Sequence, residues 1–212
     1  MIEIIPAILA KSFADLKRQA ELVRGSARLA QVDIVGKKII VGEEKMPFWG
    51  EMDYEFDLMI KNPKDMALEC VAIGAARLVL HEKSEGLRET LKALSNFRGG
   101  GDTRVQVGLA LAPTGDPYIL QTFEEQFDFA QVMGIEKEGK QGEPFDKRAI
   151  YLIERIKRMY PKIQIQVDGG VKIENARALA QAGANRLVVG SAIFGSGDPK
   201  AAMEALYTEA NA

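Results

Sequence analysis

Short runs of β-branched and other apolar residues alternate with amphipathic helical runs along the whole chain. This alternation is typical of parallel strands that are linked by helices. The stretch from Val35 to Asp53 has no helical period, so a loop or a short irregular turn is expected there. We predict a single TIM-barrel domain, a (β/α)8 fold that spans residues 1–212. The predicted strands centre on Glu3 to Ile8, Leu29 to Ile34, Tyr54 to Ile60, Arg77 to His81, Arg104 to Leu111, Phe129 to Met133, Lys162 to Val167 and Arg186 to Val189.

Capping residues mark the expected helix starts. Ser12 with Asp15 predicts a capping box. Three further polar residues each precede a proline that would take the first position of a helix. These residues are Asn62, Asp116 and Asp198.

Period-2 alternation sorts each predicted strand into a helix-facing row and a barrel-facing row. The polar members of the barrel-facing rows are Gln31, Asp33, Glu55, Asp57, Gln131, Gln164, Gln166 and Asp168. Asp33, Asp57 and Asp168 should converge near one mouth of the barrel, where strand-end carboxylates are typical of active sites. Such side chains are costly to bury unless they are paired, hydrogen-bonded or bound to a cation. Bonds to backbone N–H groups and lysines at the strand ends are the alternative interpretation.

The acidic cluster suggests a metal site. Three carboxylates and the amide oxygen of Gln31 would form an all-oxygen site for a hard divalent ion such as Mg²⁺ or Mn²⁺. Without a cation, a proton shared between two of the carboxylates could take its place. No organic cofactor is indicated.

Two glycine turns lie one βα unit apart in the last part of the chain. Gly169-Gly170 and Gly190-Ser191 offer backbone N–H groups at the mouths of adjacent strands, which is how barrels of this kind hold phosphate. A phosphorylated small molecule is therefore the expected ligand.

Three further residues are candidates for contact with that ligand. Met59 and Met133 could line an apolar pocket, although each could equally fill the core. His81, the one histidine of the chain, ends the fourth predicted strand and could also meet the substrate.

Composition excludes several classes of partner. The chain carries 28 basic and 30 acidic residues, with a formal charge of −2 and no block of like charges, so a nucleic-acid partner is not expected. No apolar run reaches the roughly 18 residues of a membrane span. We expect a soluble, cytoplasmic protein.

At the level of motifs the chain resembles the ribulose-phosphate 3-epimerase family over nearly its full length. The matching segments are PAILAKSF from Pro6, QVDIV from Gln31, FDLMIKNP from Phe56 and VDGGVKIENARALAQAGANRLVVGSAIF from Val167. The segment from Glu138 to Phe145 is a looser counterpart of the family's phosphate-covering loop, and it keeps Gly139 and Gly142.

The resemblance implies a barrel of the ribulose-phosphate-binding type, a homo-oligomer, and an epimerase that interconverts D-ribulose 5-phosphate and D-xylulose 5-phosphate. It assigns the two acid–base roles to Asp33 and Asp168, and gives a metal the role of polarising the substrate carbonyl. The family's usual metal ligands include two histidines, and here those positions carry Gln31 and Asp57. Oxygen ligands in place of imidazoles would favour a hard ion over Zn²⁺.

Two other functions remain open. A related phosphosugar decarboxylase or aldolase would keep the barrel and the phosphate grip, but such enzymes usually place a lysine among the strand-end acids. Here the run Asp57-Leu58-Met59 contains no lysine. A phosphosugar-binding barrel without turnover is the third hypothesis.

Overall fold

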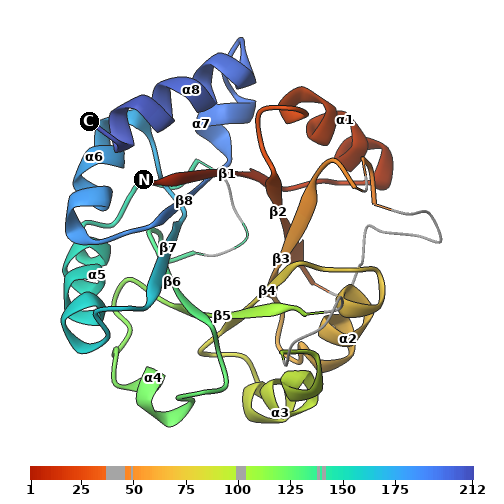
Figure 1. Ribbon diagram of the computed structural model, residues 1–212, viewed down its shortest axis with the longest axis vertical. Helices are drawn as coiled ribbons and strands as arrows, with labels where there is room; N and C mark the ends of the chain where they lie inside the picture. The colour runs from red at the N-terminus through yellow and green to blue at the C-terminus, as the bar shows by residue number, and fades with distance from the viewer. Residues whose placement is uncertain (37–45, 49, 99–103, 138, 140–141) are drawn as a thin grey trace.

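The computed structural model describes residues 1–36, 46–48, 50–98, 104–137, 139 and 142–212. Parallel strands β1 to β8 follow one another around a closed barrel, in which β8 pairs with β1 (Figure 1). The predicted TIM barrel is therefore confirmed. The strands are β1 (Glu3–Ile8), β2 (Leu29–Val35), β3 (Asp53–Met59), β4 (Arg77–His81), β5 (Gln106–Leu111), β6 (Phe129–Met133), β7 (Gln164–Asp168) and β8 (Arg186–Val189).

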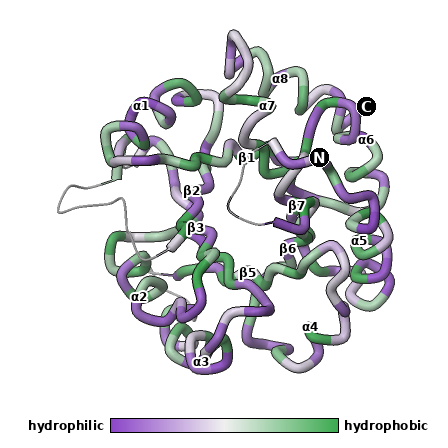
Figure 2. Tube along the Cα trace, turned by 180° about the vertical axis from the view of Figure 1, so that it is seen from behind, coloured by the Kyte–Doolittle hydropathy of each residue, from purple (hydrophilic) through white to green (hydrophobic). Residues whose placement is uncertain are grey.

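Helices surround the barrel, and Figure 2 shows hydrophilic and hydrophobic residues mixed along most of them. This mixture is expected of helices with one buried and one solvated face. None of the described helices is long and apolar enough to cross a membrane. The helices are α1 (Phe13–Val23), α2 (Lys64–Ala72), α3 (Leu87–Arg98), α4 (Ile119–Thr122), α5 (Arg148–Met159), α6 (Ile173–Ala182), α7 (Ser191–Phe194) and α8 (Pro199–Ala210).

Two of the predicted helix caps form. The Ser12 hydroxyl accepts a hydrogen bond from the Asp15 backbone N–H at 3.1 Å, but the Asp15 carboxylate accepts from the backbone N–H of Lys11, so only one half of the predicted capping box forms. The Asp198 carboxylate accepts from the backbone N–H groups of Lys200 and Ala201 at the start of α8. These bonds satisfy donors that the first turn of a helix leaves unpaired.

The other two predicted caps are wrong in position. Pro63, already in a helical conformation, is itself the N-cap of α2, and no side chain caps that helix. Asp116 accepts from the backbone N–H of Tyr118 at 3.2 Å, but α4 begins one residue later, at Ile119. Before α4 a turn at Pro117 and Tyr118 lies between the polar residue and the helix. Among the described residues 46–48 and 50–52 there is no helix between β2 and β3, as expected; residues 37–45 and 49 of that predicted loop lie outside the described residues.

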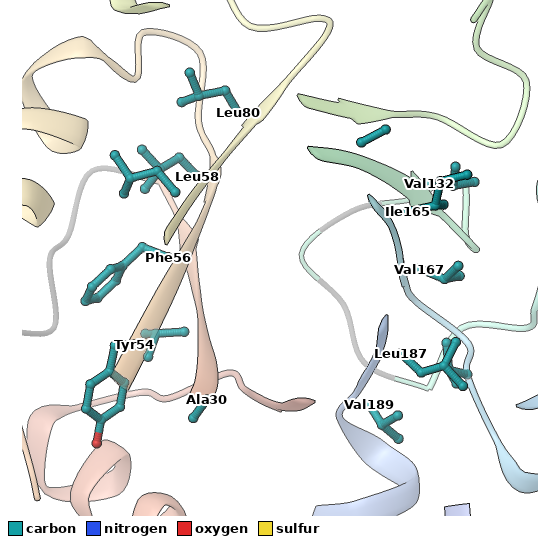
Figure 3. Close-up of a cluster of buried hydrophobic side chains, with 14 of the residues drawn as sticks. Ala30, Tyr54, Phe56, Leu58, Leu80, Val132, Ile165, Val167, Leu187 and Val189 are labelled. Carbon is teal, nitrogen blue, oxygen red and sulfur yellow. The ribbon is translucent and has the colours of Figure 1, made fainter. Parts of the chain in front are cut away.

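The main hydrophobic core lies between the barrel and the helices. Tyr54, Phe56 and Leu58 of β3 point away from the barrel axis on one side, and Val167 and Leu187 do so on the other (Figure 3). All five side chains are buried. The opposite row of each strand is therefore left to fill the barrel interior.

Phe129 and Gly108 fit together inside the barrel. The two residues are paired neighbours on β5 and β6. A Cβ atom at Gly108 would lie 2.4 Å from the Phe129 ring, a distance that real contacts do not allow. The Arg186 guanidinium also lies over the Phe129 ring, 5.0 Å from its centre.

Candidate active site

Three aspartates meet at the carboxyl ends of the strands. Strand pairing places Asp33 of β2 beside Asp57 of β3, and Asp168 is the last residue of β7. One carboxylate oxygen from each of the three lies within 4.8 Å of the other two. The sequence expectation that these side chains converge is thus met.

The amide of Gln31 lies between two of these acids. Its nitrogen donates to Asp33 Oδ1 at 2.8 Å and to Asp168 Oδ2 at 3.0 Å. Its oxygen faces the other way, 3.4 Å from the amide nitrogen of Gln166. Gln31 therefore bridges Asp33 and Asp168 as a donor.

Asp57 is held from two sides by hydrogen bonds. His81 Nε2 is 2.6 Å from Asp57 Oδ1, and the Gln131 amide donates to Asp57 Oδ2 at 2.9 Å. Asp57, Gln131 and Gln31 are fully buried, and His81 is 4% exposed. Charge-assisted bonds to both oxygens fix the orientation of the Asp57 carboxylate.

Electrostatics in the cluster disfavour three separate negative charges. Burial and, after it, the charge of Asp57 raise the pKa of Asp33 to about 7. Burial and the charges of Asp33 and Asp57 raise the pKa of Asp168 well above the ordinary value. A carboxyl group with a pKa near neutrality can both take up and release a proton at physiological pH.

A cavity opens beside Asp33 and Asp168 at this end of the barrel. Gly169 and Gly170 have φ values of 97° and 66°, in the left-handed region that favours glycine. A Cβ at Gly170 would also lie 2.9 Å from the backbone of Phe145. The cavity is lined by Ala7, Asp33, Met59, Met133, Ile135, Gly139, Gly142, Asp168, Gly169, Gly170, Val171, Val188, Gly190 and Ser191.

Most of the site residues expected from the sequence therefore share one cavity. The exceptions are Gln31, Asp57 and His81, which are buried and do not line it. Ala7, Ile135, Val171 and Val188 line the cavity without having been predicted to do so. Their apolar side chains carried no chemical signal that could have singled them out.

The donor set suits a hard cation in part. Three carboxylate oxygens at this spacing are ligands that Mg²⁺ or Mn²⁺ prefers. Gln31 was expected to add an oxygen ligand, but it presents nitrogen to Asp33 and Asp168. The groups available to an ion are therefore the three aspartates.

The strand pattern predicts that Glu55, Gln131 and Gln166 face the inside of the barrel but indicates no part for them in the site. The structure joins all three to it by hydrogen bonds. Gln131 reaches Asp57, and Gln166 reaches Gln31, Gln131 and Glu55. Their shared inward face with the aspartates was the signal that could have found them.

Comparison with known proteins agrees with this arrangement. The model of the ribulose-phosphate 3 epimerase family matches residues 3–194, which include the aspartates and both glycine turns. The chain belongs to the ribulose-phosphate 3-epimerase family. This membership makes it a phosphosugar-processing TIM barrel.

Alignments with curated relatives cover nearly the whole chain. A ribulose-phosphate 3-epimerase of Schizosaccharomyces pombe is 25% identical over 215 residues, which are 96% of this chain and 92% of the relative. The enzyme of that name from Bacillus subtilis is 28% identical over 217 residues, covering 96% and 97%. The crystal structure of 3-hexulose-6-phosphate synthase from Salmonella typhimurium has a TM-score of 0.74, with 15% identity over 99% of both chains, and shares the fold.

Proposed function

We propose that this member of the ribulose-phosphate 3-epimerase family is a ketose-phosphate epimerase, with D-ribulose 5-phosphate and D-xylulose 5-phosphate as its substrate pair. One observation carries the proposal. A single cavity is lined by Asp33 and Asp168, which have raised pKa values, and by the glycine turns at Gly169-Gly170 and Gly190-Ser191. The two proton-transferring aspartates and the proposed phosphate-binding turns would thus contact the same ligand.

The two aspartates supply the acid and the base. One carboxylate removes the proton from C3, and the electron pair of the C–H bond moves into the enediolate. The other, protonated, aspartic acid delivers its proton to C3 from the opposite face. Inversion requires two groups, because a single base would return the proton to the face from which it came.

The amide of Gln31 supports proton transfer by this pair of aspartates. It donates to both acids, at 2.8 and 3.0 Å, and so holds the two carboxyl groups in fixed orientations. The raised pKa values favour a state in which one acid is protonated and the other ionised. That state is the one the reaction needs.

A hard divalent ion such as Mg²⁺ or Mn²⁺ would be held by Asp33, Asp57 and Asp168. When bound, it would supply polarisation of the substrate carbonyl and stabilise the enediolate charge. The cluster offers no thiolate ligand, and its His81 neighbour is engaged with Asp57, so a Zn²⁺ preference is not expected.

The phosphate group would be bound at the glycine turns. Gly169 and Gly170 bring the backbone close to the cavity, and Gly190 and Ser191 lie at the start of α7. Backbone N–H groups at such positions favour a dianion. Met59 and Met133 would pack against the carbon chain of the sugar.

The lining of the cavity favours epimerisation over carbon–carbon bond chemistry. The described residues that line it include no lysine, the residue that would form a Schiff base with a carbonyl substrate. A decarboxylase or an aldolase therefore ranks behind the epimerase.

Proton NMR in D₂O tests the proposal. Wild-type protein is incubated with ribulose 5-phosphate and Mn²⁺, and the Mn²⁺ is removed before the spectrum is measured. The protein should exchange the C3 proton for deuterium and form xylulose 5-phosphate. Asp33→Asn and Asp168→Asn should each abolish inversion, with a loss of roughly 10² to 10⁴. Asp53→Asn, which changes an exposed residue at the other end of β3, should behave as wild type.

One aspartate variant can keep exchange without inversion, because the remaining acid can remove and return a proton on its own face. That result would identify the base for each epimer. If the wild-type protein gave neither exchange nor epimer with any pentulose or hexulose phosphate, while still binding one, the binding-protein hypothesis would replace the epimerase.

A further inference from the structure

A layer of polar side chains fills the middle of the barrel, directly beneath the aspartates. It consists of Glu55 on β3 and three glutamines, Gln31, Gln131 and Gln166, on β2, β6 and β7. All four are fully buried. Branched apolar residues normally fill this space in TIM barrels, so four buried polar side chains need a specific role.

Gln166 is the central member of this layer. Its amide nitrogen lies 2.6 Å from Glu55 Oε1, 2.8 Å from Gln131 Oε1 and 3.4 Å from Gln31 Oε1. Its oxygen has no hydrogen-bond partner in the described part of the chain. A reversed amide would bring that oxygen against three other oxygens, so the observed orientation is the one that the neighbours allow.

Glu55 is the nearest partner of Gln166, with its Oε1 only 2.6 Å from the Gln166 nitrogen. A carboxylate oxygen that accepts this bond keeps the nitrogen on the side of Gln166 that faces Glu55. Burial raises the pKa of Glu55 to about 7, and the guanidinium groups of Arg77 and Arg186 oppose this rise by attracting its negative charge. Arg77 is the paired neighbour of Glu55, and Arg186 that of Gln166.

The orientation of Gln166 is passed upward through the two other glutamines. Because Gln31 and Gln131 turn their oxygens down to Gln166, their nitrogens must point up. The nitrogen of Gln31 then donates to Asp33 and Asp168, and that of Gln131 donates to Asp57. Each step follows from the planarity of an amide, which has its donor and its acceptor on opposite sides.

We propose that Glu55 is a positioning residue, which sets the direction of this amide chain and thereby keeps N–H donors on all three aspartates. The direction of the chain follows from the structure alone, and its effect on turnover rests on the proposed epimerase function. Glu55 does not line the cavity and does not touch the substrate.

A double variant that exchanges the side chains of Glu55 and Gln166 tests the proposal. The double variant Glu55→Gln/Gln166→Glu has the same composition, the same number of charges and the same possible hydrogen bond between positions 55 and 166. The new carboxylate at position 166 cannot donate to Gln31 or Gln131. Both glutamines should therefore turn their nitrogens down and present oxygens to the aspartates.

An exposed pair provides the matched control. Gln121→Glu/Glu124→Gln makes the same exchange at the surface, where both residues are exposed. We expect this control to behave as wild type. The buried exchange should lower kcat by roughly 100-fold, the scale of loss for misplaced catalytic groups. KM should change much less, because the phosphate-binding turns are untouched.

Side-chain amide signals in ¹⁵N NMR spectra give a readout that does not require activity. The Gln31 and Gln131 signals, assigned with Gln31→Leu and Gln131→Leu, should shift strongly in the buried exchange while most backbone signals stay in place. Wild-type amide signals together with wild-type kcat would overturn the proposal. Should the wild-type protein catalyse no epimerisation, the amide signals would still decide the direction of the chain.

A second variant covers failure of the exchange to fold. Glu55→Gln keeps the shape of the side chain and removes its charge, so the Gln166 amide should no longer be held in one direction. Line broadening or a second set of Gln31 amide signals is the expected result. A single set that matches wild type would contradict the role of Glu55.

Discussion

Removal of one charge from the aspartate cluster should stabilise the metal-free protein at alkaline pH. In Asp33→Asn the amide oxygen still accepts the bond from Gln31, so the local packing is kept. The substitution removes repulsion with Asp57 and Asp168. The chosen oxygens lie within 4.8 Å of one another, so at an effective dielectric constant of about 20 each like-charge pair costs about 3 kcal/mol or more.

The pKa of Asp33 sets the pH window of this effect. The folded-state pKa is raised to about 7, above an unfolded value of about 3.9. The folded state therefore binds the proton more tightly, and its stability falls as pH rises from about 4 through 7. Between pH 5 and pH 8 the advantage of Asp33→Asn over wild type should grow by roughly 3 kcal/mol, at about 1.4 kcal/mol per pKa unit.

Urea unfolding in the presence of a chelator at pH 5, 6, 7 and 8 measures this difference. Asp53→Asn removes an exposed carboxylate and should show no such growth with pH. A constant or shrinking difference between Asp33→Asn and wild type across that range would refute the reasoning. It would mean that the protein relieves the repulsion in another way, for example by moving Asp168.

Three further predictions concern ligands and buried partners. Mn²⁺ at one hundred times its dissociation constant should stabilise the wild-type protein at pH 8 by about 2.7 kcal/mol, and Asp57→Asn should lose most of this gain in a thermal-shift assay. Gly190→Val should weaken binding of sugar phosphates in calorimetry by blocking the approach to the α7 turn, whereas Gly197→Val, in an open and exposed position, should not. His81→Leu should lower the free energy of unfolding by about 1 to 3 kcal/mol, because Asp57 would lose its 2.6 Å partner while buried; an unchanged denaturation midpoint would argue against that bond.

Most of the fold could be predicted from the pattern of polar and apolar residues along the strands. Alternating polar and apolar positions located the strands and put Asp33, Asp57 and Asp168 on inward faces, because side chains alternate strictly along a strand. Gln164 was placed inward by the same rule but is exposed, since it begins β7 at the open lower end of the barrel. Position along the strand decides burial as much as the face does.

Contacts across the barrel could not be predicted in the same way. Alternation tells which residues face inward but not which of them touch, so the bond between His81 and Asp57 was missed. The expected oxygen ligation by Gln31 also depended on a choice that the sequence does not show. The direction of that amide is decided by Gln166 and Glu55, on strands distant in the chain.

The fit of Gly108 to Phe129 has a consequence for how such barrels can diverge. The ring of Phe129 uses the volume that a side chain at position 108 would need. A methyl group at position 108 becomes tolerable once position 129 shrinks, and a large ring at 129 requires a bare backbone at 108. Across related sequences the residues at positions 108 and 129 should therefore covary. A side chain at position 108 can be accepted in evolution only after position 129 has changed to a smaller residue.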